Sequence, residues 1–438
     1  MRLVCSDYKW LNKLNFVNSK ILLPIIFVLI LLYNTAVNIW MKGRIETLQN
    51  VIAIAILLII AINFVLYPRK ILGSWIKENY LVVAYFIIRG ISWINSGFDY
   101  SVLRTIFFEA FFVIGIAICM IDKRTNYKLY QQIFIIVEFL FSLLCVIAFF
   151  IGKTNIFNVQ NWLNEYTYYG KFEMTAFFGN PNTGGIMAGF AIIISIILYK
   201  ECKQKWLILY AIYNIMFLFF EGSRNAILST FLILILKLII DCFKYRNKKR
   251  IIAFCLTGCL AIMAGIYAFT CYNIDIAPKH MSNVEYKISR ISSDRYIIWK
   301  ECIIEQKDHP LFGAGNLNLE QQNRTELFND SSYSYLYPKA TEFGPHNGYI
   351  GMVSGTGWLG FALFIMILFQ RIRRAEILKE GNWYLALIFI LVINLFESLF
   401  ILNRFFTCFY MFMILEMKGD REDTDNNDKY NILTEDKI

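Results

Sequence analysis

The sequence predicts an all-α integral membrane protein with about 12 transmembrane helices, and two observations support this. Hydrophobic residues make up 57% of the 438 residues and charged residues only 17%, whereas soluble domains carry roughly 25% charged residues. Apolar segments that are long enough, or nearly long enough, to cross a bilayer recur along the chain, and one helical crossing needs about 20 apolar residues. The composition therefore argues against a water-soluble fold.

The predicted spans follow from length and hydropathy. The last two are separated only by a short polar break and are the least distinct pair. The spans are Ile21–Ile39, Leu48–Leu66, Tyr80–Ile94, Leu103–Ile121, Ile133–Ile151, Ala176–Tyr199, Trp206–Phe220, Asn225–Ile240, Ile251–Cys271, Tyr349–Phe369, Trp383–Phe400 and Phe405–Glu416.

Lysine and arginine residues set the predicted orientation, because short loops rich in these cations stay in the cytoplasm. Alternate loops carry most of the cations when the N-terminus lies inside, so both termini are expected in the cytoplasm. Four regions follow: a transmembrane bundle over 1–271, one large extracytoplasmic segment with an amphipathic helix over 272–345, C-terminal transmembrane helices over 346–416, and an acidic tail over 417–438 that is expected to be disordered.

Several classes of partner and site are not supported by the sequence. The net charge of +10 comes mostly from short runs between apolar segments, where cations meet lipid headgroups, so no nucleic-acid partner is expected. The 10 cysteines show no metal-like spacing and the 3 histidines lie far apart in the chain. We therefore expect neither a metal site nor a cofactor.

A first polar motif, FFGNPNTGG over residues 177–185, stands at the predicted outer end of a span. Asn180, Pro181 and Asn182 suit a helix start, where free backbone N–H groups can hold a phosphate. An ordinary helix start is the alternative interpretation.

A second motif, EGSRNA over residues 221–226, is predicted to form a tight outward hairpin between two spans. Its Arg224 opposes the orientation rule, and a guanidinium binds phosphate oxygens in a bidentate way. The alternative is a side chain that snorkels to the interface and pairs with Glu221.

The large outer segment contains a predicted amphipathic helix that begins near Ser292 and ends before Pro310. Tyr296 and Trp299 recur at helical spacing and are interpreted as packing or interfacial anchors. Arg290 and Arg295, near the start of this helix, are candidates to face the membrane-side cavity.

A fourth motif begins where the outer segment re-enters the membrane, at His346 and Asn347. His346 is predicted in the opening turn of a helix, where the helix dipole favours a neutral imidazole that can accept a proton. The alternative is a helix cap or a bond to Asn347. Four glycines in the following span (Gly351, Gly355, Gly357 and Gly360) are interpreted as close helix packing.

In this order, the four motifs resemble the signature blocks of the O-antigen ligase and Wzy-type polymerase superfamily of bacterial surface-polysaccharide enzymes. The matching residues are F-x-N-P-N at Phe178–Asn182, S-R-x-A at Ser223–Ala226, R-x-x-x-W…P-x-F-G-x-G from Arg295 to Gly315, and H-N-x-[YL]…G-x-x-G from His346 to Gly360. In detail the resemblance covers roughly residues 175–369; the rest of the chain agrees only in its number of spans.

The resemblance implies a GT-C-like, metal-independent glycosyltransferase of the bacterial cytoplasmic (inner) membrane. Its donor and acceptor would be undecaprenyl-diphosphate-linked oligosaccharides, with membrane lipids, a chain-length regulator and a flippase as further partners. His346, Arg224 and Arg295 are the predicted catalytic residues. The predicted substrate-binding residues are Arg290, Asn180, Asn182, Asn347 and Glu221.

The preferred hypothesis is a polymerase of a capsule, O-antigen or exopolysaccharide, which transfers the glycan to a hydroxyl of another lipid-linked repeat unit. A ligase would pass the glycan to a different acceptor, and the sequence does not separate these two. A flippase for the same lipid-linked units is disfavoured, because transporters usually show repeated halves and this chain shows none.

Overall fold

The computed structural model describes about half of the chain, and every structural statement below concerns these residues. They are 21, 23–33, 51, 54, 58, 79–100, 102–103, 105–107, 109–110, 127–151, 155–156, 159–160, 181–244, 282, 284–285, 287–288, 292, 295–315, 345–375, 382–399, 407, 410–411 and 414. The predicted span Ile251–Cys271 and the tail 417–438 lie outside them, as do most of Leu48–Leu66, Leu103–Ile121 and Phe405–Glu416.

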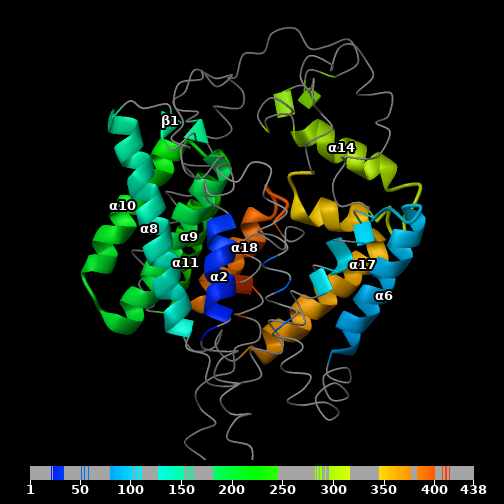
Figure 1. The fold of residues 1–438 in the computed structure, drawn as a ribbon, viewed down its shortest axis with the longest axis horizontal. Helices are drawn as coiled ribbons and strands as arrows, with labels where there is room; N and C mark the ends of the chain where they lie inside the picture. Colours follow the sequence, from blue (N-terminus) through cyan, green and yellow to red (C-terminus); the bar gives the residue numbers. More distant parts are fainter. Residues whose placement is uncertain are drawn as a thin grey trace, which may run out of the picture.

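The described part of the chain is built from helices, apart from one antiparallel pair of two-residue strands (Figure 1). The elements are α2 (Leu23–Tyr33), α6 (Tyr80–Asn95), α8 (Tyr127–Ile151), β1 (Asn155–Ile156), β2 (Val159–Gln160), α9 (Pro181–Cys202), α10 (Trp206–Glu221), α11 (Arg224–Lys244), α14 (Arg295–Glu305), α17 (Gly348–Arg374) and α18 (Trp383–Ile393).

Among the described residues, 3 helical segments have the length and apolar character to cross a membrane. They are Leu129–Ile147, Asn182–Cys202 and Gly348–Arg373. Shorter apolar helices occupy Leu23–Leu32, Tyr80–Asn95, Trp206–Glu221 and Trp383–Ile393. The predicted all-α membrane architecture is confirmed at this level, while the number of about 12 spans and the GT-C-like arrangement stay predictions.

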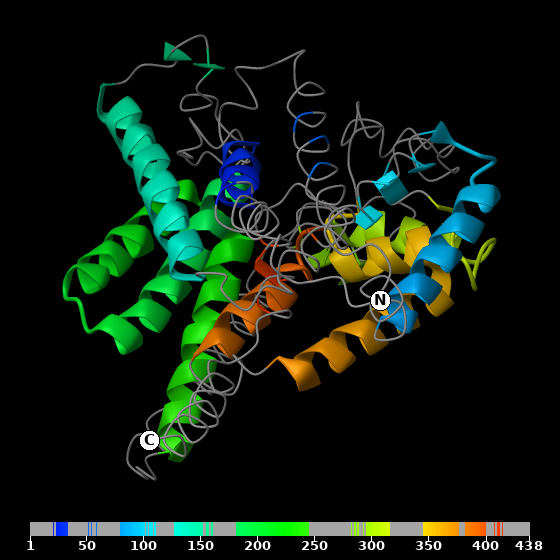
Figure 2. The same ribbon diagram turned by 60° about the horizontal axis from the view of Figure 1, so that its bottom comes forward.

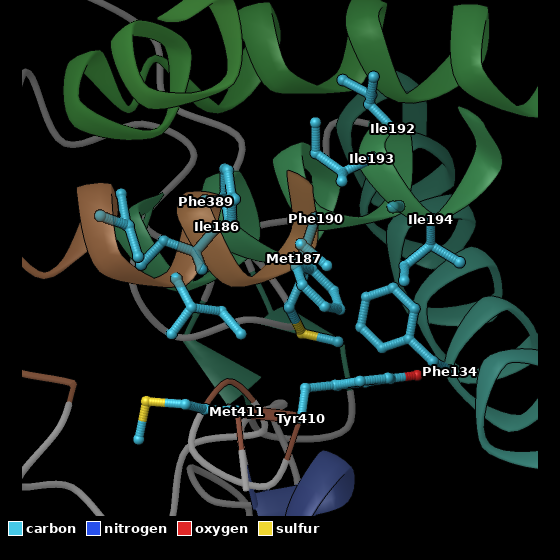
Figure 3. Packing of buried hydrophobic residues seen from close by; sticks show 14 of the residues in the cluster. Phe134, Ile186, Met187, Phe190, Ile192, Ile193, Ile194, Phe389, Tyr410 and Met411 are labelled. Atoms are coloured by element: carbon cyan, nitrogen blue, oxygen red, sulfur yellow. The ribbon is translucent and has the colours of Figure 1, made fainter. Parts of the chain in front are cut away.

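Helix α9 is the centre of the main hydrophobic core. In the most apolar stretch of α9, 78% of the residues are buried. The corresponding stretches of α8 and α17 are 39% and 33% buried. Phe190 of α9 contacts Phe134 of α8, Phe389 of α18 and Tyr410, with ring centroids 4.8 to 5.8 Å apart (Figure 3). Edge-on and tilted aromatic contacts of this kind stabilise a packed core beyond the area that they bury.

Two glycines let α11 approach the first half of α9. A Cβ atom added at Gly185 would lie 2.6 Å from Ser223 Cβ, and one at Gly189 would lie 2.4 Å from Thr230 Oγ1. These glycines are one helical turn apart, the spacing that brings two membrane helices close together. The contact fixes the start of α11, and with it Arg224, beside the start of α9.

Helix α17 is kinked at Gly357, and the segment Pro310–Gly315 docks into the kink. Gly357 has φ +69°, and the backbone there bonds the docked segment instead of continuing the helix. Four backbone hydrogen bonds of 2.9 to 3.1 Å join the two: Ala314 N to Ser354 O, Gly315 N to Gly355 O, Trp358 N to Pro310 O and Leu359 N to Leu311 O.

This docking corrects the interpretation of the span glycines as helix-packing residues. An added Cβ at Gly357 would lie 2.2 Å from Leu311 C, and one at Gly313 would lie 2.5 Å from Gly355 C. Gly313 and Gly357 therefore allow the loop and the backbone of α17 to approach each other closely. Gly360 does face a helix, since its added Cβ would lie 3.3 Å from Ile88 Cγ2 of α6.

We expect Gly357→Ala to destabilise the protein, whereas Gly90→Ala should not. A side chain at Gly357 meets a left-handed backbone and the Leu311 carbonyl, and strain of this kind costs about 1–3 kcal/mol. Gly90 lies inside α6 with nothing within 4 Å of an added Cβ, so alanine should be neutral or favourable there. Thermal unfolding in detergent measures both variants, and an unchanged transition for Gly357→Ala would contradict the assignment.

The helix ends are arranged as an alternating bundle requires. At one end, called here the site end, the start of α9 meets the start of α11, because Ser223 Oγ donates to Asn182 Oδ1 at 3.1 Å. At the opposite end the last turn of α9 meets the start of α18, where Lys200 Nζ donates to Asn382 Oδ1 at 3.2 Å. Arg371, near the end of α17, likewise bonds Asn79 before α6.

Labelling of single cysteines tests the predicted sidedness. In a cysteine-free background, Ser282→Cys should react with a membrane-impermeant maleimide in intact spheroplasts, because residues 272–345 are predicted outside. Cys202, restored alone at the opposite end of α9, should react only after the membrane is opened. Both positions are exposed, so access within the protein does not limit the reaction. Labelling with the reverse preference would contradict the topology.

Candidate functional site

Glu397 lies in the turn after α18, and its carboxylate joins two elements that are distant in sequence. Arg295, the first residue of α14, donates from Nη2 to Glu397 Oε1 at 2.7 Å. His346 Nδ1 lies 3.3 Å from Glu397 Oε2. The side chains of Arg295 and Glu397 are each only 11% exposed, so the ion pair is largely shielded from water.

The turn that carries Glu397 is shaped by Asn394. The Asn394 side chain donates to Ile390 O at 2.7 Å and accepts from Leu399 N at 2.9 Å, and asparagine bonds of this kind compete with the helical pattern. Helix α18 therefore ends at Ile393, before the predicted end of the span at Phe400. Gly348 N donates to the carbonyl oxygens of both Asn394 and Glu397, at 2.7 and 3.0 Å.

Asn347 is the N-cap of α17. Its side-chain oxygen accepts from Tyr349 N and Ile350 N, both at 3.0 Å, and its Nδ2 donates to Leu395 O at 2.9 Å. These bonds satisfy N–H groups that a helix start leaves open, and they tie α17 to the turn after α18. In the structure the Asn347 amide caps α17. A contact between Asn347 and substrate stays a prediction.

His346 precedes this cap, so it stands just before α17 and not in the opening turn as predicted. Its backbone is left-handed, with φ +46°, which costs a residue with a Cβ about 1–2 kcal/mol. The loop is held from both sides: Trp299 Nε1 of α14 donates to Pro345 O at 2.8 Å, and Asn347 N donates to Ser398 Oγ at 3.0 Å. The strained backbone thus aims the ring at Glu397.

The second sequence motif reaches the same turn through Asn225. Its side-chain nitrogen lies 3.3 Å from Glu397 Oε1; with the amide turned over, its oxygen accepts from Arg295 Nη1 and Nη2 at 2.7 and 3.0 Å. Arg224, the preceding residue, begins α11 and is exposed. Asn182 is tied to this motif by its bond with Ser223. The structure thus brings parts of all four motifs together.

Three other predicted site residues differ in their placement. Glu221 is the last residue of α10 and is fully buried, and the following Gly222 ends the helix with φ +71°. Asn180 and Arg290 lie outside the described residues, so their predicted contacts with substrate stay predictions.

The charged groups of the site differ in their exposure. Glu397 follows the end of α18, where one carboxylate oxygen bonds Arg295 and the other lies 3.3 Å from His346 Nδ1. The Arg295 charge is in turn offset by Glu397, and its guanidinium also bonds Phe396 O. Arg224 is the cation of this group that the structure leaves exposed.

A second buried ion pair, outside this group, joins Arg89 of α6 to Glu109. Arg89 Nε donates to Glu109 Oε2 at 3.0 Å, and Tyr85 Oη donates to Glu109 Oε1 at 2.7 Å. Tyr85 also contacts Met352 Sδ of α17, the helix that lies beside α6 in both views (Figure 1 and Figure 2). Among the described residues no group of three or more His, Cys, Asp or Glu side chains lies close enough to hold a metal ion.

Sequence reasoning missed Glu397, although a signal was present. Glu397 is a carboxylate within the apolar run Trp383–Phe400, and an ionisable residue in a predicted span is costly and usually functional. The family resemblance covers roughly residues 175–369 and therefore does not reach this run.

Residues 209–365 match a family model with the description "Wzy_C: O-Antigen ligase". The matched segment contains Arg224, Arg295 and His346, whereas Asn182 and Glu397 lie outside it. A search of curated proteins gave no significant match.

Proposed function

Because residues 209–365 match the O-antigen ligase family model, we propose that this protein is a membrane glycosyltransferase that polymerises a bacterial surface polysaccharide. Its donor is an undecaprenyl-diphosphate-linked glycan, and its acceptor is a hydroxyl of another lipid-linked repeat unit. The proposal places the reaction on the outer face of the cytoplasmic membrane, within a GT-C-like bundle of about 12 spans.

The observation that carries this proposal is the meeting of the family segment's polar residues at the site end. Arg295 and His346 share the carboxylate of Glu397, and Asn225 attaches the turn that bears Arg224 to the Arg295–Glu397 ion pair. These residues come from α11, α14, the loop before α17 and the turn after α18. An interaction scaffold would not need a buried carboxylate that joins an imidazole to a guanidinium.

The chemistry follows from the charges at this site. Transfer forms a bond between the acceptor hydroxyl oxygen and the anomeric carbon, and breaks the bond from that carbon to the diphosphate oxygen. The hydroxyl proton passes to His346, and the leaving diphosphate gains negative charge. Positive charge placed where this charge develops stabilises the transition state, and the exposed Arg224 supplies it. Nucleotide sugars are not available outside the cell, so a lipid-borne donor suits an outer-face enzyme.

The ligase is the second candidate, because the matching family model is described as an O-antigen ligase. A ligase would use the same donor and the same site residues but would transfer the glycan to another acceptor, such as lipid A core or a cell-wall polymer. The two functions differ only in which hydroxyl enters the site.

Incubating the purified protein with lipid-diphosphate repeat units tests the proposal. Longer glycans identify a polymerase, whereas glycan transferred to an added second acceptor identifies a ligase. Unchanged glycan that has crossed the membrane of a vesicle identifies a flippase and contradicts both. Unchanged glycan on its original side, with either acceptor present, contradicts the proposed transfer activity.

A further inference from the structure

We propose that Glu397 is a positioning residue, which sets the orientation and tautomer of His346 and fixes the Arg295 guanidinium beside it. This inference rests on the proposed function and deepens it. It concerns a residue outside the segment that matches the family model, so the family match does not supply it.

The two oxygens of the Glu397 carboxylate have different partners. Oε1 accepts from Arg295 Nη2 at 2.7 Å, and Oε2 lies 3.3 Å from His346 Nδ1. An ionised carboxylate can only accept hydrogen bonds, so a bond with Nδ1 requires the proton to be on that nitrogen. The neutral ring then keeps its acceptor lone pair on Nε2. An imidazole in this tautomer can take the proton of an acceptor hydroxyl through Nε2.

The bond with Arg295 favours the ionised form of the Glu397 carboxylate, and the orientation of His346 requires this form. Glu397 is 11% exposed, and an isolated buried carboxylate would favour its protonated form. A protonated oxygen facing Nδ1 would act as donor and would favour the opposite tautomer. Because Arg295 bonds the other oxygen, the ion pair favours the charged acceptor form.

The local backbone also points to an oriented ring. His346 adopts φ +46° while the residues on both sides are held by Trp299 and Ser398. Strained residues of this kind persist where the surroundings determine them, and they cluster at functional sites. An ion pair that only joined α14 to the turn after α18 would need Arg295 but would not need His346.

The test is a double-mutant cycle between Glu397→Gln and His346→Gln, with turnover measured on purified protein. Glu397→Gln should lower turnover by at least about tenfold, because replacing an orienting carboxylate by an amide allows the wrong tautomer. The double variant should lose much less than the product of the two single losses, since residues that act as a unit are not additive. Leu395→Ala is the matched control: its side chain is 44% exposed in the same turn, and it should keep wild-type turnover.

The outcomes separate this inference from the proposed function. Product from the wild-type protein together with near-normal turnover of Glu397→Gln would overturn the inference alone, and so would losses that multiply in full in the double variant. No transfer by the wild-type protein to any acceptor would overturn the proposed function and the inference with it.

If the Gln variant does not accumulate in the membrane, Glu397→Asp is measured in its place. The shorter acid keeps the charge but cannot reach both Arg295 and His346 at their present separations. We expect a smaller loss than for Gln, again less than multiplicative with His346→Gln. Full wild-type turnover in the Asp variant would overturn the inference.

Discussion

Arg224→Ala is expected to abolish polymer formation while the protein stays in the membrane. Arg224 begins α11 at the site end and is exposed, whereas the charge of Arg295 is offset by Glu397. Removal of Arg224 therefore takes away an exposed guanidinium that could bind a diphosphate. Arg224→Lys should restore little activity, because an ammonium is a point charge and does not reproduce the planar fork of a guanidinium.

The measurement is the length distribution of surface polysaccharide in cells, together with transfer by the purified variants. Lys205→Ala is the matched control, since it removes an exposed cation from the turn between α9 and α10, at the opposite end of the bundle. Wild-type chain lengths in cells that carry Arg224→Ala would show that this guanidinium does not hold the leaving group.

His346→Ala and His346→Gln should each lower turnover by at least about 10²-fold while binding of the lipid-linked donor survives, because positioned bases typically contribute about 10²–10⁴-fold in rate. The side-chain amide of glutamine can donate a hydrogen bond to Glu397, but it cannot take a proton from the acceptor hydroxyl. His309→Gln is the matched control, because His309 lies in the loop after α14, where its backbone N–H and carbonyl bond Gln306.

The two site variants should fail in different ways. Loss of a base lowers kcat, whereas loss of a cation that grips the donor also weakens donor binding. Donor binding measured on detergent-solubilised protein, beside transfer rates, separates the two effects. Near-normal turnover of His346→Gln would show that this position supplies a hydrogen bond only.

Much of the helical framework could be predicted from the sequence. The predicted starts at Tyr80, Trp206 and Trp383 coincide with the first residues of α6, α10 and α18, because a change from polar to apolar residues is a local signal. Local chemistry also predicted two other starts. Pro181 is the first residue of α9, and Ser292 Oγ accepts from Tyr296 N before the first turn of α14.

The tertiary structure alone decided which residues meet. Hydropathy and the distribution of cations predicted that the four motifs lie on one side of the membrane. The approach of α11 to α9, however, depends on Gly185 and Gly189. The hydrogen bond between Ser223 and Asn182 follows from that approach. In the same way, Gly357 was predicted to pack against another helix, and its contact with the loop Pro310–Gly315 is visible only in the tertiary structure. The periodic spacing of residues shows which of them share one face of a helix. It does not show which segment packs against that face.

Glu397 shows this division most clearly. In the sequence it is one carboxylate in an apolar run, and its partners Arg295 and His346 are 102 and 51 residues away. The sequence by itself determined that helices cross a membrane, that cations favour one orientation, and that four polar motifs share an end. The tertiary structure decided that a carboxylate beyond those motifs joins a histidine to an arginine. Contacts between distant segments depend on how whole helices pack, and no local propensity encodes that packing.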